Sequence, residues 1–224
     1  MNIPSEFDEI RPYSPEELPQ IFEELLSDKD FQEVVKVVLP DIPFETLAHT
    51  LRQCRTSLDV QKNIFHGLLH DILRKYSDGF SLDVSALTEK NKGYTFISNH
   101  RDIVLDSGFL SVGLIDNNFP TTVEIAIGDN LLIYPWIKKL VRVNKAFIVQ
   151  RALSMRQMLE SSARMSSYIH FAVTQKRENI WIAQRQGRAK DSNDRTQDTI
   201  LKMLVMAGEG DVIERLKEMN LVPL

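Results

Sequence analysis

The sequence predicts an α/β fold in which a mixed sheet is flanked by helices and preceded by a helical N-terminal segment. Up to residue 79, apolar residues recur at helical spacing. From residue 80 onward, short runs rich in β-branched and aromatic residues alternate with helical patterns, which is typical of a layered α/β sheet. We therefore expect a helical segment over residues 1–79 and an α/β domain over residues 80–224.

The helical segment opens with a capping-box pattern. In "YSPEELPQIFEELL", Ser14 is the expected N-cap, Pro15 takes the first helical position and Glu17 the third. Amphipathic patterns follow, and we expect their apolar stripes to be buried. These later helical patterns are "DKDFQEVVKVVL", "PFETLAHTLRQC" and "SLDVQKNIFHGLLHDILRKY".

The second part of the chain alternates between the two periodicities. "LVPL" at the end resembles the start of one more strand, so we expect residues beyond Leu224 to complete the sheet of a longer protein. The expected strands are "FSLDVS", "YTFIS", "TTVEIAIG", "KAFIVQR" and "NIWIAQR". The expected helices are "LLIYPWIKKLV", a long one from Ser154 to about Thr174, "TQDTILKMLVMAG" and "DVIERLKEMN".

Composition excludes several classes of protein. Of the 224 residues, 43% are hydrophobic and 26% charged, and no apolar run approaches the roughly 20 residues that a membrane span needs. The acidic start does not resemble a signal peptide, so we expect a cytoplasmic protein. Cys54 is the only cysteine, which rules out an intrachain disulfide and a cysteine-rich metal site.

The net charge of −4 hides an uneven distribution of charge. Residues 138–195 carry 13 Lys and Arg against 4 Asp and Glu, whereas the rest of the chain is acidic. Such segregation indicates a face that meets an anion, whether phosphate, an anionic lipid surface or nucleic acid. The alternative interpretation is a chance cluster of solvated charges.

Three loops rich in His, Asp or Arg follow expected strands: "NHRDIVLD", "QRALSMRQ" and "QRQGRAKD". In open α/β sheets, functional sites gather at the carboxyl ends of the strands. The three loops together therefore predict a site more strongly than any one of them does.

His100 is the candidate general base, because a neutral imidazole accepts a proton near working pH. Asp102 and Asp106 are the candidate carboxylates that would orient the ring. If the next helix begins after Asp102, that residue is a natural N-cap, and His100 lies in the preceding turn within reach of Asp106. The alternative is a histidine and an aspartate that merely cap a helix.

The other two loops offer groups that bind anions. Arg151 follows "FIVQ" directly, where a strand end can aim a guanidinium at a phosphate, although a surface arginine packed on the sheet would look the same. In the third loop, Gly187 permits a tight turn, and Arg188 and Lys190 are cationic. Charged loops are common, so this loop alone indicates anion binding only weakly.

Other motifs do not support a function. "HGLLH" places His66 and His70 four residues apart, but no third zinc ligand accompanies them in the sequence, so we expect no metal. There is no glycine-rich nucleotide motif and no GxSxG nucleophile elbow.

The order of these segments resembles that of the glycerolphosphate and lysophosphatidic acid acyltransferase family over residues 80–224. "SNHRDIVLDS" is similar to the first family motif, which implies His100 as base and Asp106 as its partner, with Asp102 in reserve. "GDNLLIYPWIKKLVRVNKAFIVQR" is similar to the second motif, with Arg151 in the place of its arginine. "QRQGRAK" and the terminal "LVPL" are similar to the third and fourth motifs.

The resemblance implies acyl transfer from acyl-CoA or acyl carrier protein to a hydroxyl of glycerol 3-phosphate, lysophosphatidate or a related acceptor in phospholipid synthesis. No cofactor is implied, nor any nucleic-acid partner, and the protein would lie peripherally on the inner face of the membrane. The residues that would bind the acceptor phosphate are Arg151, Gln186, Gly187, Arg188 and Lys190.

Two features depart from the family pattern. Five residues separate His100 from Asp106, where the family has four, and Gln186 replaces the glutamate of the third motif. Two alternatives therefore stay open. One is a catalytically weakened, lipid-binding member of the family. The other is a phosphate-recognising hydrolase that uses His100, Asp102 and Asp106 as metal ligands.

Overall fold

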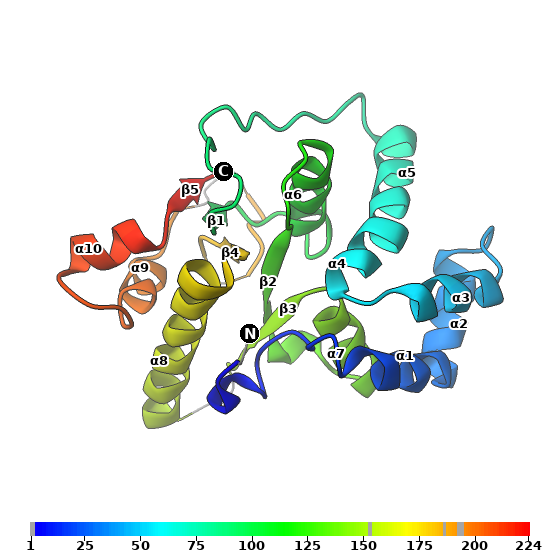
Figure 1. Ribbon diagram of the computed structural model, residues 1–224, viewed down its shortest axis with the longest axis horizontal. Helices are drawn as coiled ribbons and strands as arrows, with labels where there is room; N and C mark the ends of the chain where they lie inside the picture. The colour runs from blue at the N-terminus through cyan, green and yellow to red at the C-terminus, as the bar shows by residue number, and fades with distance from the viewer. Residues whose placement is uncertain (1–2, 152–153, 186, 192–194) are drawn as a thin grey trace. The chain divides into compact units, whose positions relative to one another are not determined.

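The computed structural model describes residues 3–151, 154–185, 187–191 and 195–224, which form two compact units (Figure 1). The α/β unit contains residues 3–11, 81–130 and 147–224, and the helical unit contains residues 12–80 and 131–146.

This division differs from the expected boundary at residues 79 and 80 in two places. Residues 3–11 belong to the α/β unit, where the carbonyl of Ile10 accepts a hydrogen bond from the N–H of Ile148 at 2.9 Å. Residues 131–146 belong to the helical unit, where Trp136 contacts the ring of Phe31 with centroids 5.9 Å apart.

The α/β unit contains a parallel sheet of five strands in the order β3-β2-β4-β1-β5, so the expectation of a mixed sheet is wrong. β1 lies inside the sheet, because Thr95 pairs with Ile180 on one side and with Leu221 on the other. The strands are β1 (Thr95–Ser98), β2 (Val123–Gly128), β3 (Ala146–Val149), β4 (Asn179–Ala183) and β5 (Leu221–Pro223).

"FSLDVS" was expected as a strand, and that prediction is wrong, because residues 80–85 have no regular structure. There the Asp83 side chain accepts a hydrogen bond from the N–H of Ser85 at 2.9 Å. An aspartate that bonds to the backbone two residues on favours a turn over an extended strand.

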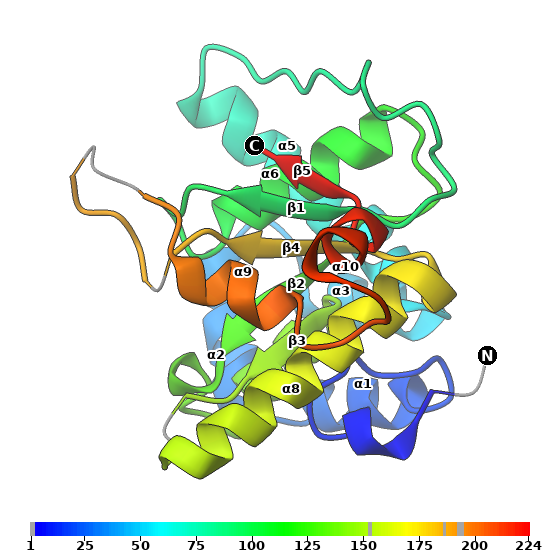
Figure 2. The same ribbon diagram turned by 90° about the vertical axis from the view of Figure 1, so that its left-hand side faces the viewer.

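Helices cover both faces of the sheet. Figures 1 and 2 show α6 on one face and α8, α9 and α10 on the other. The long helix predicted from Ser154 is confirmed, although its last turn is π-helical. The helical elements of this unit are η1 (Ser5–Phe7), α6 (Leu105–Asp116), α8 (Met155–Phe171), the π-helical η4 (Ala172–Lys176), α9 (Asp198–Leu204) and α10 (Val212–Glu218).

A buried polar network links β2 to α8 and η4. Glu124 is 2% exposed, and its carboxylate accepts hydrogen bonds from the Tyr168 hydroxyl and the Lys176 ammonium group. Burial, followed by the neighbouring Glu124 carboxylate, raises the pKa of Tyr168 well above its ordinary value, so the phenol stays protonated and donates. The carboxylate thus has the partners that a buried charge requires.

The helical unit has its own apolar core, which includes Phe22, Leu25, Phe31 and Leu51. Its elements are α1 (Leu18–Leu26), α2 (Lys29–Val38), α3 (Phe44–Gln53), α4 (Ser57–Val60), the π-helical η2 (Gln61–Phe65), α5 (His66–Tyr76) and α7 (Pro135–Val143). The short 3-10 helix η3 (Asp129–Leu131) lies at the boundary between the two units in the sequence.

The first helix begins later than its capping-box pattern predicts. α1 starts at Leu18 and not at Pro15, and residues 15–17 form a turn. One of the two reciprocal bonds of a capping box is described: the N–H of Ser14 donates to the Glu17 carboxylate at 2.7 Å. Within the described part of the chain, no helix is long and apolar enough to cross a bilayer.

Candidate active site

The candidate site lies at the carboxyl edge of the parallel sheet. Figure 2 shows the arrowheads of β1, β4 and β5 pointing to the same edge. The loops that follow β1 and β4 meet there, because the N–H of Ala189 donates to the carbonyl of His100 at 2.8 Å. A parallel sheet thus brings together segments almost ninety residues apart.

His100 and Asp106 form a direct pair. His100 Nδ1 lies 2.9 Å from Asp106 Oδ2, and the two side chains are only 15% and 17% exposed. His100 is in the loop after β1, and Asp106 is in the first turn of α6. Because this bond is made through Nδ1, Nε2 is the ring nitrogen that would transfer a proton if His100 acts as a general base.

Backbone groups hold the Asp106 carboxylate in place. Its Oδ2 accepts from the N–H of Arg101 at 2.8 Å, and both oxygens lie 3.2 Å from the N–H of Asp102. Backbone N–H groups are fixed by the fold, so they fix the orientation of the carboxylate that they bond. The charge opposite His100 is therefore preorganised rather than supplied by a mobile side chain.

The imidazole packs against an aromatic ring from the neighbouring strand. Trp181 of β4 meets His100 edge to face, with centroids 5.8 Å apart, and its indole N–H donates to Ser98 Oγ at 2.9 Å. The sequence did not identify Trp181 as a site residue, because it is one apolar residue among several in the expected strand "NIWIAQR". It restricts the ring orientation of His100, and we count it as part of the candidate site.

Asp102 has a different position from Asp106. Its Oδ1 accepts from the N–H groups of Val104, the N-cap residue of α6, and of Leu105, the first residue of that helix, both at 2.8 Å. Asp102 is therefore not the N-cap that the sequence suggested, and it holds the turn that leads into α6. The Leu105 N–H first, then that of Val104 and the positive charge of Arg188, lower the pKa of Asp102 despite partial burial. The structure thus places Asp106 against the imidazole and Asp102 at the helix end.

Arg151 follows β3 at the same edge of the sheet. Its N–H lies 3.2 Å from Asp129 Oδ1, and its side chain passes over Gly128, the last residue of β2. A Cβ atom added at Gly128 would lie 2.5 Å from Asn130 Oδ1 and 2.6 Å from Arg151 Nε, so both side chains would have to shift. Gly128 therefore leaves the space in which the guanidinium lies, a role that the sequence did not reveal.

The loop after β4 is closed at its base. The N–H of Gln197 donates to the carbonyl of Gln184 at 2.9 Å, and Gln184 also donates through its side chain to Asn99 Oδ1. Within the loop, Gly187 has φ +76°, a left-handed conformation that favours glycine. Arg188 and Lys190 are exposed, and Gln186 lies outside the described residues.

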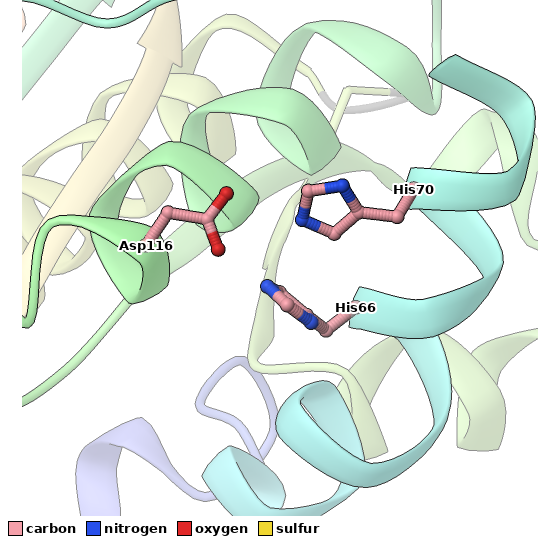
Figure 3. A group of neighbouring side chains, drawn as sticks. All are labelled: His66, His70 and Asp116. Atoms are coloured by element: carbon pink, nitrogen blue, oxygen red, sulfur yellow. The ribbon is translucent and has the colours of Figure 1, made fainter. Parts of the chain in front are cut away.

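His66 and His70 lie elsewhere, in the helical unit. They project from successive turns of α5, with ring centroids 4.5 Å apart (Figure 3).

No profile of a known protein family and no curated protein matches this chain. Its function is therefore inferred from its own residues, their geometry and the motifs that they resemble.

Proposed function

We propose that this protein is an acyltransferase that moves a fatty acyl group from acyl-CoA or acyl carrier protein to a hydroxyl of a phosphorylated glycerol acceptor. One observation carries the proposal: the hydrogen bond between His100 Nδ1 and Asp106 Oδ2 at the carboxyl edge of the sheet. The similarity of "SNHRDIVLDS" to the first motif of the glycerolphosphate acyltransferases supports the same assignment.

In the proposed reaction, His100 Nε2 takes the proton of the acceptor hydroxyl while that oxygen attacks the thioester carbonyl. The tetrahedral intermediate then expels the thiolate, which receives the proton from the imidazolium. Asp106 stabilises the imidazolium and keeps the ring in one orientation. No acyl-enzyme intermediate is needed.

The acceptor phosphate would be held by cations from two loops. Arg151 follows β3, and Arg188 and Lys190 lie in the loop after β4. Arg188 is close enough to Asp102 for its positive charge to help lower the pKa of that carboxyl group. A guanidinium binds phosphate in a fixed, two-pronged geometry, so it orients as well as attracts. Such positioning would hold the hydroxyl beside the base.

The five-residue gap between His100 and Asp106 does not argue against this mechanism. Asp106 reaches the imidazole at 2.9 Å because the segment before α6 makes a turn, in which Asp102 accepts from the N–H groups of Val104 and Leu105. Geometry therefore favours an active enzyme over a weakened, lipid-binding relative.

The metal-dependent hydrolase is less well supported. His100, Asp102 and Asp106, all described, do not bring three ligand atoms within 4.8 Å of one another. The Asp106 oxygens instead accept backbone hydrogen bonds, which a metal ion would have to replace.

The decisive experiment measures thiol release from acyl-CoA with and without glycerol 3-phosphate or lysophosphatidate. We expect release that requires an acceptor and persists in a metal chelator. Release that needs a divalent ion and no acceptor would support the hydrolase. Substrate binding without turnover would support the weakened relative.

Variants then test the pair itself. His100→Ala should abolish transfer, and Asp106→Asn should lower kcat by about 10²- to 10⁴-fold, since the amide cannot stabilise the imidazolium. The chain offers a matched control in His170, whose Nε2 lies 2.8 Å from Glu218 in the same unit. His170→Ala should leave transfer unchanged. Equal losses from both histidines would remove His100 as the base.

A further inference from the structure

The first six residues of α8 are all exposed, although they form regular helix. From Met155 to Glu160 every side chain faces solvent, and burial begins at Ser161. The helix start is well defined, because the N–H of Ser154 donates to the Gln157 side chain at 3.0 Å in a capping box. This exposed segment is therefore not a frayed end.

Three large apolar side chains lie on one stripe of this segment. Met155, Met158 and Leu159 are 81%, 50% and 63% exposed, and their spacing of three and four residues places them on one helix face. We call them the α8 stripe. Exposed apolar side chains in a contiguous group mark an interaction surface more often than single ones do.

The α8 stripe lies at the edge of the sheet that carries His100. α8 follows β3, and Figure 2 shows its start on the side to which the strand arrowheads point. A second exposed apolar pair, Ile103 and Val104, follows β1 at the same edge, immediately before α6. Apolar groups thus lie beside two of the loops that form the candidate active site.

Cations flank these apolar groups. Some exposed basic residues precede the α8 stripe or lie within it. Others lie in the loops after β1 and β4. Arg156 is 90% exposed and pairs with Glu160 at 3.0 Å, within the same helix. The exposed basic residues of this edge are Arg101, Arg151, Arg156, Arg188, Lys190 and Arg195.

We infer that the start of α8 is a docking surface for a bilayer that contains anionic phospholipid. The stripe would enter the boundary between headgroups and acyl chains, and the exposed cations of this edge, Arg156 within the stripe among them, would contact lipid phosphates. Charge complementarity favours this occupant over a second copy of the chain, since two copies would bring like charges together. The inference rests on the proposed function only in that a lipid acceptor would then be delivered to His100 from the same surface.

The test is co-sedimentation with phosphatidylcholine vesicles, prepared with and without phosphatidylglycerol. We expect binding that increases with phosphatidylglycerol and weakens at high salt, because screening reduces the attraction. The triple variant Met155→Gln, Met158→Gln, Leu159→Gln keeps helix-forming side chains and should lower partitioning at least about tenfold. Arg156→Gln should lower binding to the anionic vesicles only.

A matched control comes from α10, where Val212 and Ile213 are 54% and 57% exposed. The double variant Val212→Gln, Ile213→Gln should bind vesicles as the wild type does. Undiminished binding by the triple variant would overturn the inference. So would light scattering that shows the wild type as a dimer and the triple variant as a monomer, with neither protein on vesicles.

Activity separates this inference from the proposed function. The triple variant should keep its turnover with soluble glycerol 3-phosphate and lose it with vesicle-borne lysophosphatidate. Vesicle binding that depends on the α8 stripe, without turnover on any acceptor, would uphold the docking surface and overturn the acyltransferase. Turnover of both acceptors with no vesicle binding would uphold the acyltransferase and overturn the docking surface.

Discussion

At the scale of single residues, two aspartates four positions apart have separate tasks. Asp106 contacts the imidazole of His100, and Asp102 accepts from the first N–H group of α6, that of Leu105. Both assignments stay open in the sequence, because either carboxylate lies within reach of a histidine in a loop. The turn before α6 settles the difference, since it directs one carboxylate toward the ring and the other toward the helix N–H groups.

Asp102→Ala should lower the free energy of unfolding by about 1 kcal/mol near pH 7, because the N–H groups of Val104 and Leu105 lose their acceptor. Backbone N–H groups, that of Leu105 foremost, lower the pKa of Asp102 in the folded protein. Its contribution is thus complete above the unfolded pKa of about 3.9 and is lost as the pH falls through the folded value. Urea unfolding of both proteins over a pH series measures this difference. A difference that grew on acidification would contradict a stabilising role for the ionised Asp102 carboxylate.

At the scale of elements, the end of β2 shapes the place of Arg151. Gly128→Ala should raise the acceptor KM several-fold with a smaller effect on kcat, because the added methyl group displaces the side chains of Asn130 and Arg151. Steady-state kinetics of this variant and of Arg151→Ala should show the same pattern.

The control for that experiment is Gly67→Ala in α5, where a new Cβ would meet nothing within 4 Å. It should leave the KM unchanged and stabilise the helix slightly. An unchanged KM in Gly128→Ala would show that the position of Arg151 does not govern acceptor binding.

The network of Glu124, Tyr168 and Lys176 joins three elements in the interior. Tyr168→Phe should lower the free energy of unfolding by about 1–3 kcal/mol, because a buried carboxylate loses a donor. Tyr94→Phe, which removes a longer bond of 3.3 Å to the Glu89 carbonyl, should cost less.

Alkaline pH gives this network a second signature. Burial raises the pKa of Tyr168, so its contribution is complete below the unfolded pKa of about 10 and declines as the pH rises toward the folded value. The wild type should therefore lose stability above pH 10 more steeply than Tyr168→Phe does. Parallel slopes in denaturant titrations would contradict a raised pKa.

At the scale of the whole molecule, the chain forms two compact units, each with a core of its own. Leu25 is fully buried in the helical unit, and Leu114 in the α/β unit. Each change to Ala should cost about 2–5 kcal/mol through the cavity that it leaves.

Native-state hydrogen exchange should locate each loss. Leu25→Ala should raise exchange in the helical unit and Leu114→Ala in the α/β unit, if the two open as separate cooperative units. Equal acceleration across both units in either variant would show one cooperative structure instead.

The sequence predicts most of the secondary structure, because helices and strands differ in the spacing of their apolar residues. Most strands and helices follow from periodicity, and β5 was expected from four residues at the chain end. The errors have local causes as well: the Asp83 turn in place of a strand, and the turn of residues 15–17 before α1. Residues 131–146 look like part of the α/β domain by order alone, whereas Trp136 packs in the helical unit.

The candidate site, like the fold, was predicted from the sequence only in part. The sequence determines that three site residues follow strands, because each comes after a short run of β-branched or aromatic residues. These residues are His100, Arg151 and Arg188. Trp181 beside the imidazole, Gly128 beneath Arg151 and the choice of Asp106 are decided only by the tertiary structure. These depend on strand order and on contacts between segments far apart in the chain, which local propensity does not encode.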